Sequence, residues 1–261
     1  MIFILYFIIV LFATIIGATA GLGGGVIIKP LFDLVGIHTA EIIGIYSSVA
    51  VLTMCVVSIY KQYKKGIHVN LSIVFWISLG SFSGGVLGDE VFEKIVDILG
   101  SDSYVKAVQS ILLLFILLLI LYFTKKENNL LKYKIQSSFL IFDLGLVLGT
   151  VSVFLGIGGG PLNIAIFTMF FSIGMKDAVI YSLATIFFSQ ISKLGLFVFL
   201  SKEINIDINL FVLIIIAALL GGYIGTKINQ SKDEKTIKSI YEYTIVLLIF
   251  ISLFNVVRWF I

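Results

Sequence analysis

The stretch Gly21-Leu-Gly-Gly-Gly25 recurs as Gly156-Ile-Gly-Gly-Gly160, 135 positions further along the chain. Each stretch ends a long apolar segment and opens a short one, so the chain breaks or turns sharply there. Glycine suits such a break because it adopts positive φ angles without steric cost. A matching break in each half of one chain predicts a duplicated fold.

Two further landmarks support the duplication. The tripeptide at 45–47 matches the one at 180–182 with the same offset of 135, and the glycine pair at 84–85 matches the pair at 221–222 with an offset of 137. Three aligned landmarks make a chance match improbable. We therefore expect a first membrane repeat at 1–124, a cytoplasmic linker at 125–137 and a second membrane repeat at 138–261.

The composition is that of a membrane protein. Hydrophobic residues make up 59% of the chain and charged residues 13%, whereas soluble domains carry about 25% charged residues. Apolar runs of roughly 20 residues recur from end to end, which leaves no stretch for a separate soluble domain. We expect an all-α integral membrane protein, whose first segment is a retained helix because no positively charged leader precedes it. The expected segments are 2–20, 25–37, 42–60, 70–88, 105–124, 138–156, 160–175, 178–200, 208–226 and 241–261, of which 25–37 and 160–175 are short.

The lysines predict the orientation, because cytoplasmic loops accumulate positive charge. We take all ten segments as crossings and place the loop of Lys61, Lys64 and Lys65 in the cytoplasm. An odd number of crossings per half then makes the repeats inverted, as in many secondary transporters. If the short segments do not cross, the halves become parallel, which the charge bias disfavours. The remaining inner lysines are Lys125, Lys126, Lys132, Lys134, Lys176, Lys227, Lys232, Lys235 and Lys238. The outer side receives Lys94, Lys106, Lys202 and Arg258, with Asp89, Glu90, Glu93, Asp97 and Asp102 in the same outer loop as the first two.

The glycine breaks are candidate anion sites. Irregular backbone at membrane depth survives only against protein or a watery cavity, and the amides that open a helix carry partial positive charge. Tight helix packing is the alternative, and it suits the pairs at 84–85 and 221–222. A nucleotide site is excluded because no Lys-Ser or Lys-Thr follows the glycines. The predicted substrate-binding glycines are Gly21, Gly23, Gly24, Gly25, Gly156, Gly158, Gly159 and Gly160.

Two lysines lie within apolar segments. Lys29 follows the first break by about one helical turn, and Lys193 lies in the long segment 178–200. Intramembrane cations usually face protein or a cavity, where they would attract an anion. Snorkelling of the ammonium group to an interface is the alternative.

Hydroxyl and amide side chains near the breaks complete the predicted site. They either bind substrate oxygens or bridge helices, and the repetition of a Tyr-Ser pair beside a repeated break favours binding. These residues are Tyr46, Ser47, Asn163, Tyr181, Ser182 and Gln190. Asp33, His38 and Glu41, near the end of the first short segment, could relay protons, but we interpret them as ordinary loop residues.

Enzymatic chemistry has no support in the sequence. Cys55 is the only cysteine, so neither an internal disulfide nor a cysteine-based metal cluster can form. We find no metal triad, no nucleophile-base set and no phosphate loop, and we predict no catalytic residue, metal or cofactor. The net charge of +3 comes from loop lysines and indicates no nucleic acid partner.

The first glycine run leads into Lys29-Pro-Leu-Phe32, and this stretch resembles the first signature of the sulfite exporter TauE/SafE family, a glycine run followed by Pro-Leu. The stretch from Gly149 to Pro161 resembles its second signature. The resemblance spans both repeats and implies a permease for small anions, typically sulfite, sulfonates or related organosulfur compounds. The chain departs from the family pattern in two ways. Where the family often has Gly-Thr-Ser after the short segment, this chain has Ile-Tyr-Ser at 45–47 and at 180–182. In addition, Ala165 stands where the first repeat has Pro30.

These observations predict a secondary transporter in the cytoplasmic membrane that moves a small anion by alternating access at a midplane site. A carrier of another solute and a non-transporting assembly subunit are the alternatives. Acids near the first short segment permit coupling to protons and hydroxyl groups permit coupling to sodium, so the coupling ion stays open. The sequence also leaves open whether the protein is a monomer or a homodimer, and whether it imports or exports.

Overall fold

The structure, a computed structural model, describes residues 2–66, 69–126, 134–199 and 207–260, without the side chains of Lys126, Trp259 and Phe260. Its regular elements over these residues are all helices, in two sets of five. The first set is α1 (Ile2–Ala20), α2 (Gly25–Val35), α3 (Ala40–Lys64), α4 (Leu71–Leu99) and α5 (Asp102–Lys126). The second is α6 (Ser138–Leu155), α7 (Gly160–Phe170), α8 (Met175–Phe199), α9 (Ile208–Ser231) and α10 (Glu234–Phe260).

Eight of these helices are long and apolar enough to cross a membrane, so the protein is a multi-pass membrane protein. The short helices α2 and α7 have 11 residues each. At 1.5 Å per residue each spans about 16 Å, roughly half of the hydrocarbon core. Taking all ten segments as crossings is therefore wrong, because hydropathy marks a segment as apolar without fixing its length to the bilayer.

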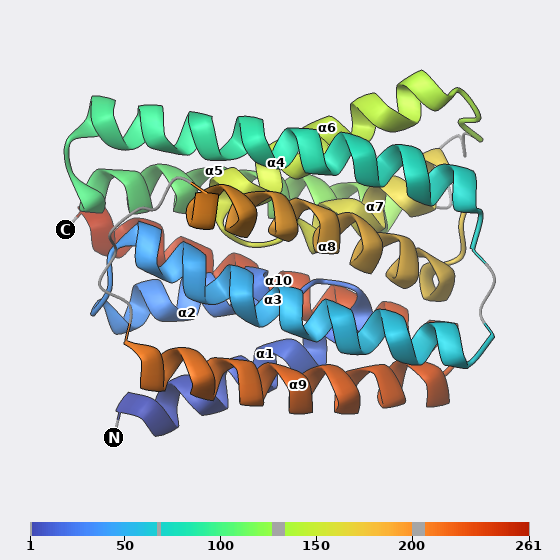
Figure 1. Ribbon diagram of the computed structural model, residues 1–261, viewed down its shortest axis with the longest axis horizontal. Coiled ribbons are helices and arrows are strands. Elements are labelled where there is room, and N and C mark those ends of the chain that lie inside the picture. The colour runs from blue at the N-terminus through green and yellow to red at the C-terminus, as the bar shows by residue number, and fades with distance from the viewer. Residues whose placement is uncertain (1, 67–68, 127–133, 200–206, 261) are drawn as a thin grey trace.

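Each short helix instead folds back beside the helix before it. The amide of Leu22 bonds to the carbonyl of Gly17 at 3.0 Å, and a Cβ on Gly24 would lie 3.2 Å from the carbonyl oxygen of Ala13. The chain therefore returns along α1 toward the end where α1 began, and α6 and α7 form a similar pair from the other end (Figure 1). After such a folded-back pair, the chain is on the same side of the membrane on which it started. Two full crossings would have the same result.

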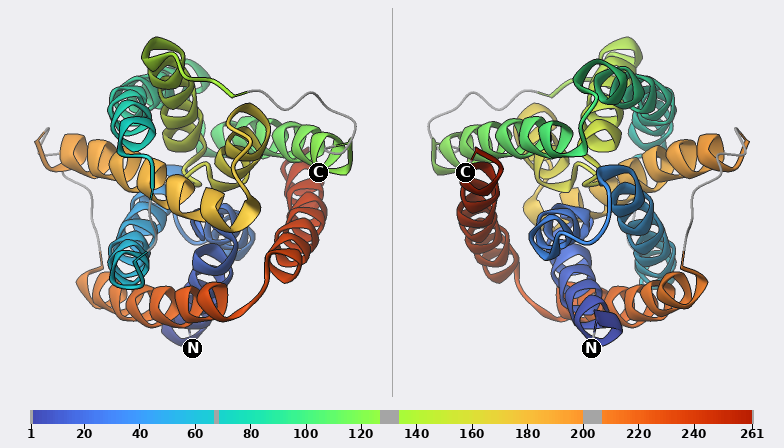
Figure 2. Two further views of the ribbon diagram at one scale, coloured as in Figure 1. Left: turned by 90° about the vertical axis from the view of Figure 1, so that its right-hand side faces the viewer. Right: turned by 90° about the vertical axis from the view of Figure 1, so that its left-hand side faces the viewer.

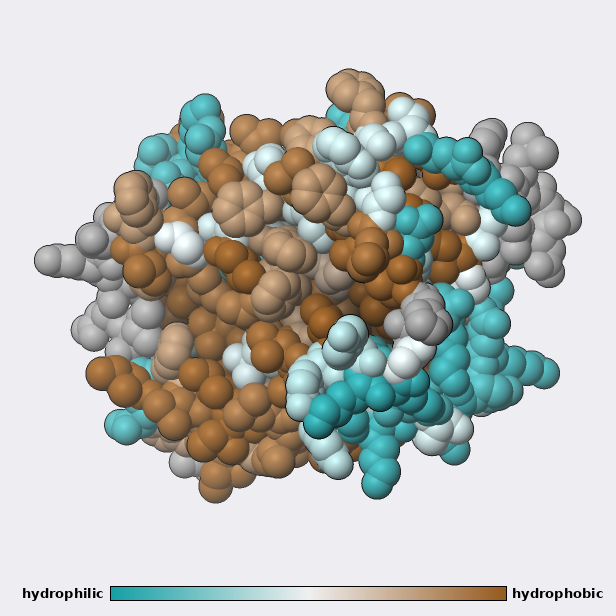
Figure 3. Space-filling view, turned by 45° about the vertical axis from the view of Figure 1, so that its right-hand side comes forward, coloured by the Kyte–Doolittle hydropathy of each residue, from teal (hydrophilic) through white to brown (hydrophobic). Residues whose placement is uncertain are grey.

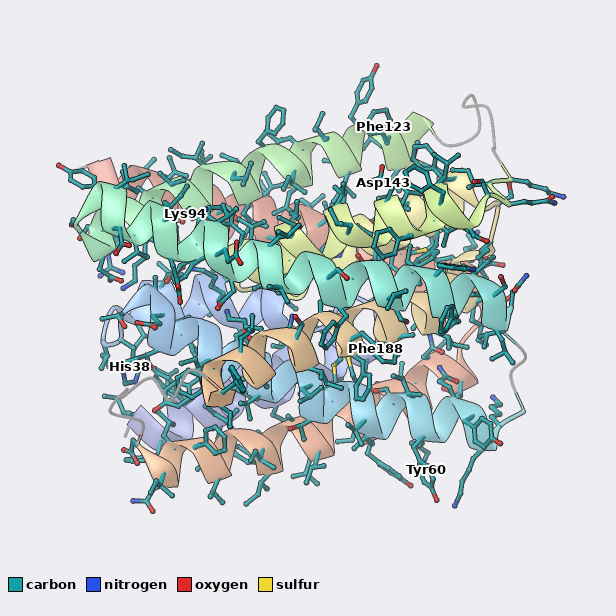
Figure 4. All side chains as sticks on the ribbon, turned by 45° about the horizontal axis from the view of Figure 1, so that its top comes forward. His38, Tyr60, Lys94, Phe123, Asp143 and Phe188 are labelled. Carbon is teal, nitrogen blue, oxygen red and sulfur yellow. The ribbon has the colours of Figure 1, made fainter. Side chains whose placement is uncertain are left out.

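The two ends of the bundle differ in charge. We call the right-hand end of Figure 1 the lysine-rich end, and the end that carries both termini the opposite end. Hydrophilic residues gather where the lysine-rich end comes forward, beside a broad apolar surface (Figure 3). Tyr60 lies toward the lysine-rich end and His38 at the opposite end (Figure 4). The described lysines of the lysine-rich end are Lys61, Lys64, Lys65, Lys125, Lys134, Lys176, Lys227, Lys232, Lys235 and Lys238, whereas Lys132 and Lys202 lie outside the described residues.

The two halves of the chain pack through each other. In the first half α4 lies along α6 of the second, and α9 of the second half lies along α1 of the first (Figure 2). A Cβ on Gly84 would overlap the carbonyl oxygen of Leu146, and one on Gly225 would overlap that of Ile15. Gly222 likewise faces the backbone of Met54 on α3. The later glycines thus permit close helix packing, as the sequence indicated.

The helix α4 is longer than hydropathy predicts. It continues to Leu99 and ends at Gly100, whose φ of 59° and hydrogen bond to the Val96 carbonyl form a left-handed cap. The acids expected in an outer loop at 89–97 are therefore helical, and Asp102 begins α5. The loop assignment is wrong because a polar stretch can leave the bilayer as a helix, which hydropathy cannot distinguish from a loop.

Candidate functional site

The two glycine breaks meet inside the bundle. A Cβ on Gly25 would lie 2.5 Å from the carbonyl oxygen of Ile157, and a Cβ on Gly160 would overlap the carbonyl of Leu22. The first residue of each short helix thus packs against the backbone of the other break. Only glycine allows this approach, because any side chain would displace a main-chain carbonyl.

The backbone of both breaks adopts conformations that favour glycine. Six glycines have φ between 66° and 80°, namely Gly21, Gly23, Gly24, Gly156, Gly158 and Gly159. In the described part of the chain, no hydrogen bond is donated by the amides at 23–25 or at 158–160. Unpaired amides at membrane depth are costly unless a ligand or water meets them. Both breaks therefore present donors without acceptors.

The helices that follow the breaks point their positive ends toward each other. From the breaks α2 runs to the opposite end and α7 runs to the lysine-rich end (Figure 1). Their first residues are in contact, so the partial positive charges of two helix N-termini add in one small region. An anion is the ligand that this arrangement favours.

Serine side chains flank the breaks. Ser182 of α8 donates a hydrogen bond of 2.6 Å to the carbonyl of Gly21. Its counterpart Ser47 on α3 lies 3.0 Å from the position of a Cβ on Gly25, and its buried hydroxyl has no partner within the described residues. Asn163 is fully buried on α7, with its side-chain oxygen also unpartnered there. These polar groups lie where the sequence predicted them, although no ligand role follows from position alone.

Two aliphatic side chains that sequence reasoning missed fill the space between the breaks. A Cβ on Gly23 would lie 2.9 Å from Ile186 of α8, and one on Gly158 would lie 3.4 Å from both Ile186 and Val51 of α3. Val51 and Ile186 are themselves 135 positions apart, so the repeat offset could have identified them. Ile186 thus contacts both breaks, and Val51 contacts the second.

Lys29 is a buried cation beside the second break. Its ammonium pairs with Asp33 at 2.7 Å, and both side chains are 3% exposed. Its Cδ atom lies 3.4 Å from the position of a Cβ on Gly156, so its stem passes along the break of the other half. Snorkelling to a polar interface is not the arrangement found for Lys29.

The loop interpretation of Asp33 and Glu41 is wrong. Asp33 lies within α2, which Gly36 caps, and Glu41 lies in the first turn of α3. His38 does lie in the connection between these helices, where its ring contacts Tyr6 and Tyr46. Burial lowers the pKa of His38 below its usual value.

Lys193 and Gln190 lie on the same helix as Ser182. Gln190 is buried one turn beyond Ile186 on α8, and the half-buried Lys193 follows almost one turn later. The ammonium of Lys193 lies 2.9 Å from the position of a Cβ on Gly44. Its side chain shares a cavity of about 20 Å³ with Glu41 and Asp89. One face of α8 thus carries polar groups from the breaks toward the opposite end.

The repeated tyrosines lie away from the breaks. The Tyr46 hydroxyl accepts a hydrogen bond of 3.1 Å from the amide of Asp207, which caps α9. The Tyr181 hydroxyl accepts one of 2.7 Å from the amide of Asn70, which caps α4. Each tyrosine thus holds the start of a helix from the other half. Their predicted contact with substrate stays a prediction.

A larger cavity borders the far end of α7. Its volume is about 480 Å³, and Ala165, Thr168, Glu234 and Lys238 are among its lining residues. These residues come from α7 and from the start of α10 at the lysine-rich end. The cavity is large enough to admit a small solute, since ligand pockets commonly measure about 300–1,000 Å³.

Eight long helices, with two short ones that begin at the glycine breaks, define a multi-pass membrane protein. The chain matches the family described as Sulfite exporter TauE/SafE over residues 6–253. It belongs to this family, whose members are membrane transporters rather than enzymes. Searches of curated proteins and of solved structures gave no match.

Proposed function

We propose that the protein is a secondary transporter for a small sulfur-containing anion, such as sulfite or a sulfonate. The observation that carries this proposal is the contact between the two glycine breaks, which brings two helix N-termini and their unpaired amides together. Sulfur oxyanions present several acceptor oxygens to such donors. Family membership supports the choice of anion.

The two repeats, which we place at 1–124 and 138–261 with a linker at 125–137, are inverted. Each half consists of one folded-back pair followed by three crossings, which is an odd number, so the second half enters from the other side. The directions of α1 and α6 in Figure 1 support this relation. Inverted repeats allow alternating access, in which one arrangement of the halves opens to each side in turn.

The lysine-rich end faces the cytoplasm, and the protein resides in the cell membrane. The positive-inside rule supports this orientation, because the folded-back pairs leave the expected loop sides unchanged. The cavity beside α7 then opens toward the cytoplasm. A substrate anion would reach the breaks from that cavity past Ile164, which lines it and whose Cδ1 atom lies 2.8 Å from the position of a Cβ on Gly21.

Lys193 provides long-range attraction for the anion. Its ammonium lies on the helix face that leads from the breaks, and charge interactions are strong in a medium of low dielectric constant. The buried Lys29 adds charge on the other flank, although Asp33 compensates part of it. The amides would therefore contact the anion and the lysines would raise its local concentration.

Transport into liposomes tests the proposal. Purified protein should move sulfite or a small sulfonate, and Lys193→Met should raise the KM about tenfold, which corresponds to about 1.4 kcal/mol. The matched control is Lys94→Met, an exposed lysine near the opposite end. Anion-dependent thermal stabilisation should accompany transport, because a ligand stabilises the state that binds it.

Two results would contradict the proposal. Flux of another solute with no response to sulfur anions would identify a different carrier. Absence of any flux and of any anion-dependent stabilisation in well-folded protein would indicate an assembly subunit. An unchanged KM in both Lys29→Met and Lys193→Met would leave the backbone amides alone as the anion site.

A further inference from the structure

A small polar cavity lies beside the second break, among α2, α5 and α10. Its volume is about 10 Å³, close to the space that one water-sized sphere requires. The polar residues that line it include the ion pair of Lys29 and Asp33, together with Gln109, Ser252 and Asn255. Each of these residues is at most 3% exposed.

The cavity collects oxygen atoms that have no hydrogen-bond partner. Gln109 donates through its amide nitrogen to the Phe154 carbonyl at 2.6 Å, and Asn255 donates to the Pro30 carbonyl at 3.0 Å. Because the carbonyls can only accept, both amide groups are fixed in orientation and their oxygens must face elsewhere. Within the described residues those two oxygens have no partner.

A carboxylate and a hydroxyl add to the set. Asp33 uses one oxygen for Lys29, while its other oxygen is buried and unpartnered in the described structure. The Ser252 hydroxyl has no partner there either. Four oxygens from three helices thus line one cavity, and three of them can only accept. Buried acceptors without donors are costly, so the cavity is built for a positively charged or strongly donating occupant.

We propose that this cavity binds a sodium ion that is coupled to anion transport. A proton on Asp33 would satisfy one oxygen, and a water molecule could donate only two hydrogens. A small metal cation can meet all four oxygens at once, and hard cations prefer such ligands. The cavity has one carboxylate, which it shares with Lys29. This single negative charge compensates a monovalent cation better than a divalent cation.

The position of the cavity links the cation to the proposed anion site, and this step rests on the proposed function. Leu155, the residue before the second break, lines the cavity, and the stem of Lys29 passes Gly156. A sodium ion at Asp33 competes with the Lys29 ammonium and frees it to face an anion at the break. Sodium and anion then raise each other's affinity by the same factor.

The other half of the chain offers a matched control. The positions 135 residues beyond Lys29 and Asp33 are Ile164 and Thr168 on α7, so the corresponding positions hold neither the ammonium nor the carboxylate. Thr168→Val alters a polar residue at the equivalent place without touching the proposed ligands. Ser252→Ala removes one proposed ligand without changing charge.

Sodium binding can be measured without any substrate anion. We expect purified protein to bind ²²Na⁺ saturably and to gain thermal stability in NaCl but not in equimolar KCl or choline chloride. Ser252→Ala and Asn255→Leu should weaken sodium binding about tenfold each, and Asp33→Asn should abolish it. Thr168→Val should bind as the unaltered protein does. Sulfite affinity should rise with sodium in the unaltered protein and in Thr168→Val, but not in Asp33→Asn.

Equal stability in sodium and choline salts would overturn the proposal and leave water or a proton in the cavity. Sodium binding that survives both Ser252→Ala and Asn255→Leu would place the ion elsewhere. If Asp33→Asn fails to fold, these two uncharged variants decide the matter. Sodium binding without sulfite flux would contradict the proposed function but not the cation site. Sulfite flux that does not depend on sodium would contradict the coupled cation site but not the proposed function.

Discussion

The two short helices have the same backbone plan and different side chains. Both α2 and α7 have 11 residues, follow a glycine break and begin where the breaks touch. α2 buries an ion pair, whereas α7 carries Ile164 and Thr168 at the equivalent positions. The cavity beside α2 holds about 10 Å³, and the one beside α7 holds about 480 Å³.

This difference distinguishes the attraction of an anion, which both halves can provide, from the binding of a coupling ion. The shared feature is a pair of helix N-termini with unpaired amides, so the chemistry that attracts an anion is common to both halves. Charged side chains occur at only one of the two short helices, so any coupling ion that needs a carboxylate there belongs to the first half.

The largest expected effect comes from adding one methyl group where the breaks touch. Gly25→Ala and Gly160→Ala should each abolish transport and lower the yield of folded protein, because the new Cβ meets a main-chain carbonyl that cannot rotate away. Overpacking of this kind costs roughly 1–3 kcal/mol or more. Size-exclusion profiles, Tm and flux measure the effect.

Gly100→Ala is the matched control for the glycine variants. Gly100 also has a positive φ of 59°, but nothing lies within 4 Å of its added Cβ. Gly100→Ala should lower the free energy of unfolding only by the backbone strain it introduces, about 1–2 kcal/mol. If Gly25→Ala is tolerated while Gly160→Ala is not, the two breaks are not equivalent.

Cysteine labelling should distinguish the two cavities. Thr168→Cys in the wall of the larger cavity should react with a membrane-impermeant maleimide applied to the lysine-rich side, and Ser252→Cys in the smaller cavity should not. The background is low because the native Cys55 is buried. Modification is read as a mass shift. Rapid labelling of Ser252→Cys would show that the α2 side is open as well.

The smallest expected effect concerns the tyrosines that cap helices of the other half. Tyr46→Phe and Tyr181→Phe each remove one hydroxyl acceptor, at a cost of about 1 kcal/mol, and should lower Tm by about 2–4 °C. Substrate KM should stay constant, because both hydroxyls lie at helix caps. Tyr60→Phe, at an exposed tyrosine, is the control. A raised KM would restore the substrate contact predicted from sequence.

Much of the architecture could be predicted from local sequence. Apolar runs located all ten helices, and the glycine runs marked both breaks, because hydropathy and positive-φ glycines are local properties. A boundary failed where charge continued on a helix, as in α4 to Leu99, whereas Asp33 lies inside the expected segment 25–37. The predicted number of crossings was wrong because hydropathy does not reveal that the chain turns back at Leu22, beside Gly17.

The amino-acid sequence alone predicts a duplicated membrane chain with two glycine breaks and two intramembrane lysines, since repeat offsets and composition are read along the chain. Contacts between side chains on different helices can be seen only in the folded protein. The Tyr46 and Tyr181 hydroxyls accept hydrogen bonds from helix caps of the other half, and Gln109 joins Asn255 at one cavity. These residues come from helices far apart in the chain, and the packing that unites them depends on many contacts at once.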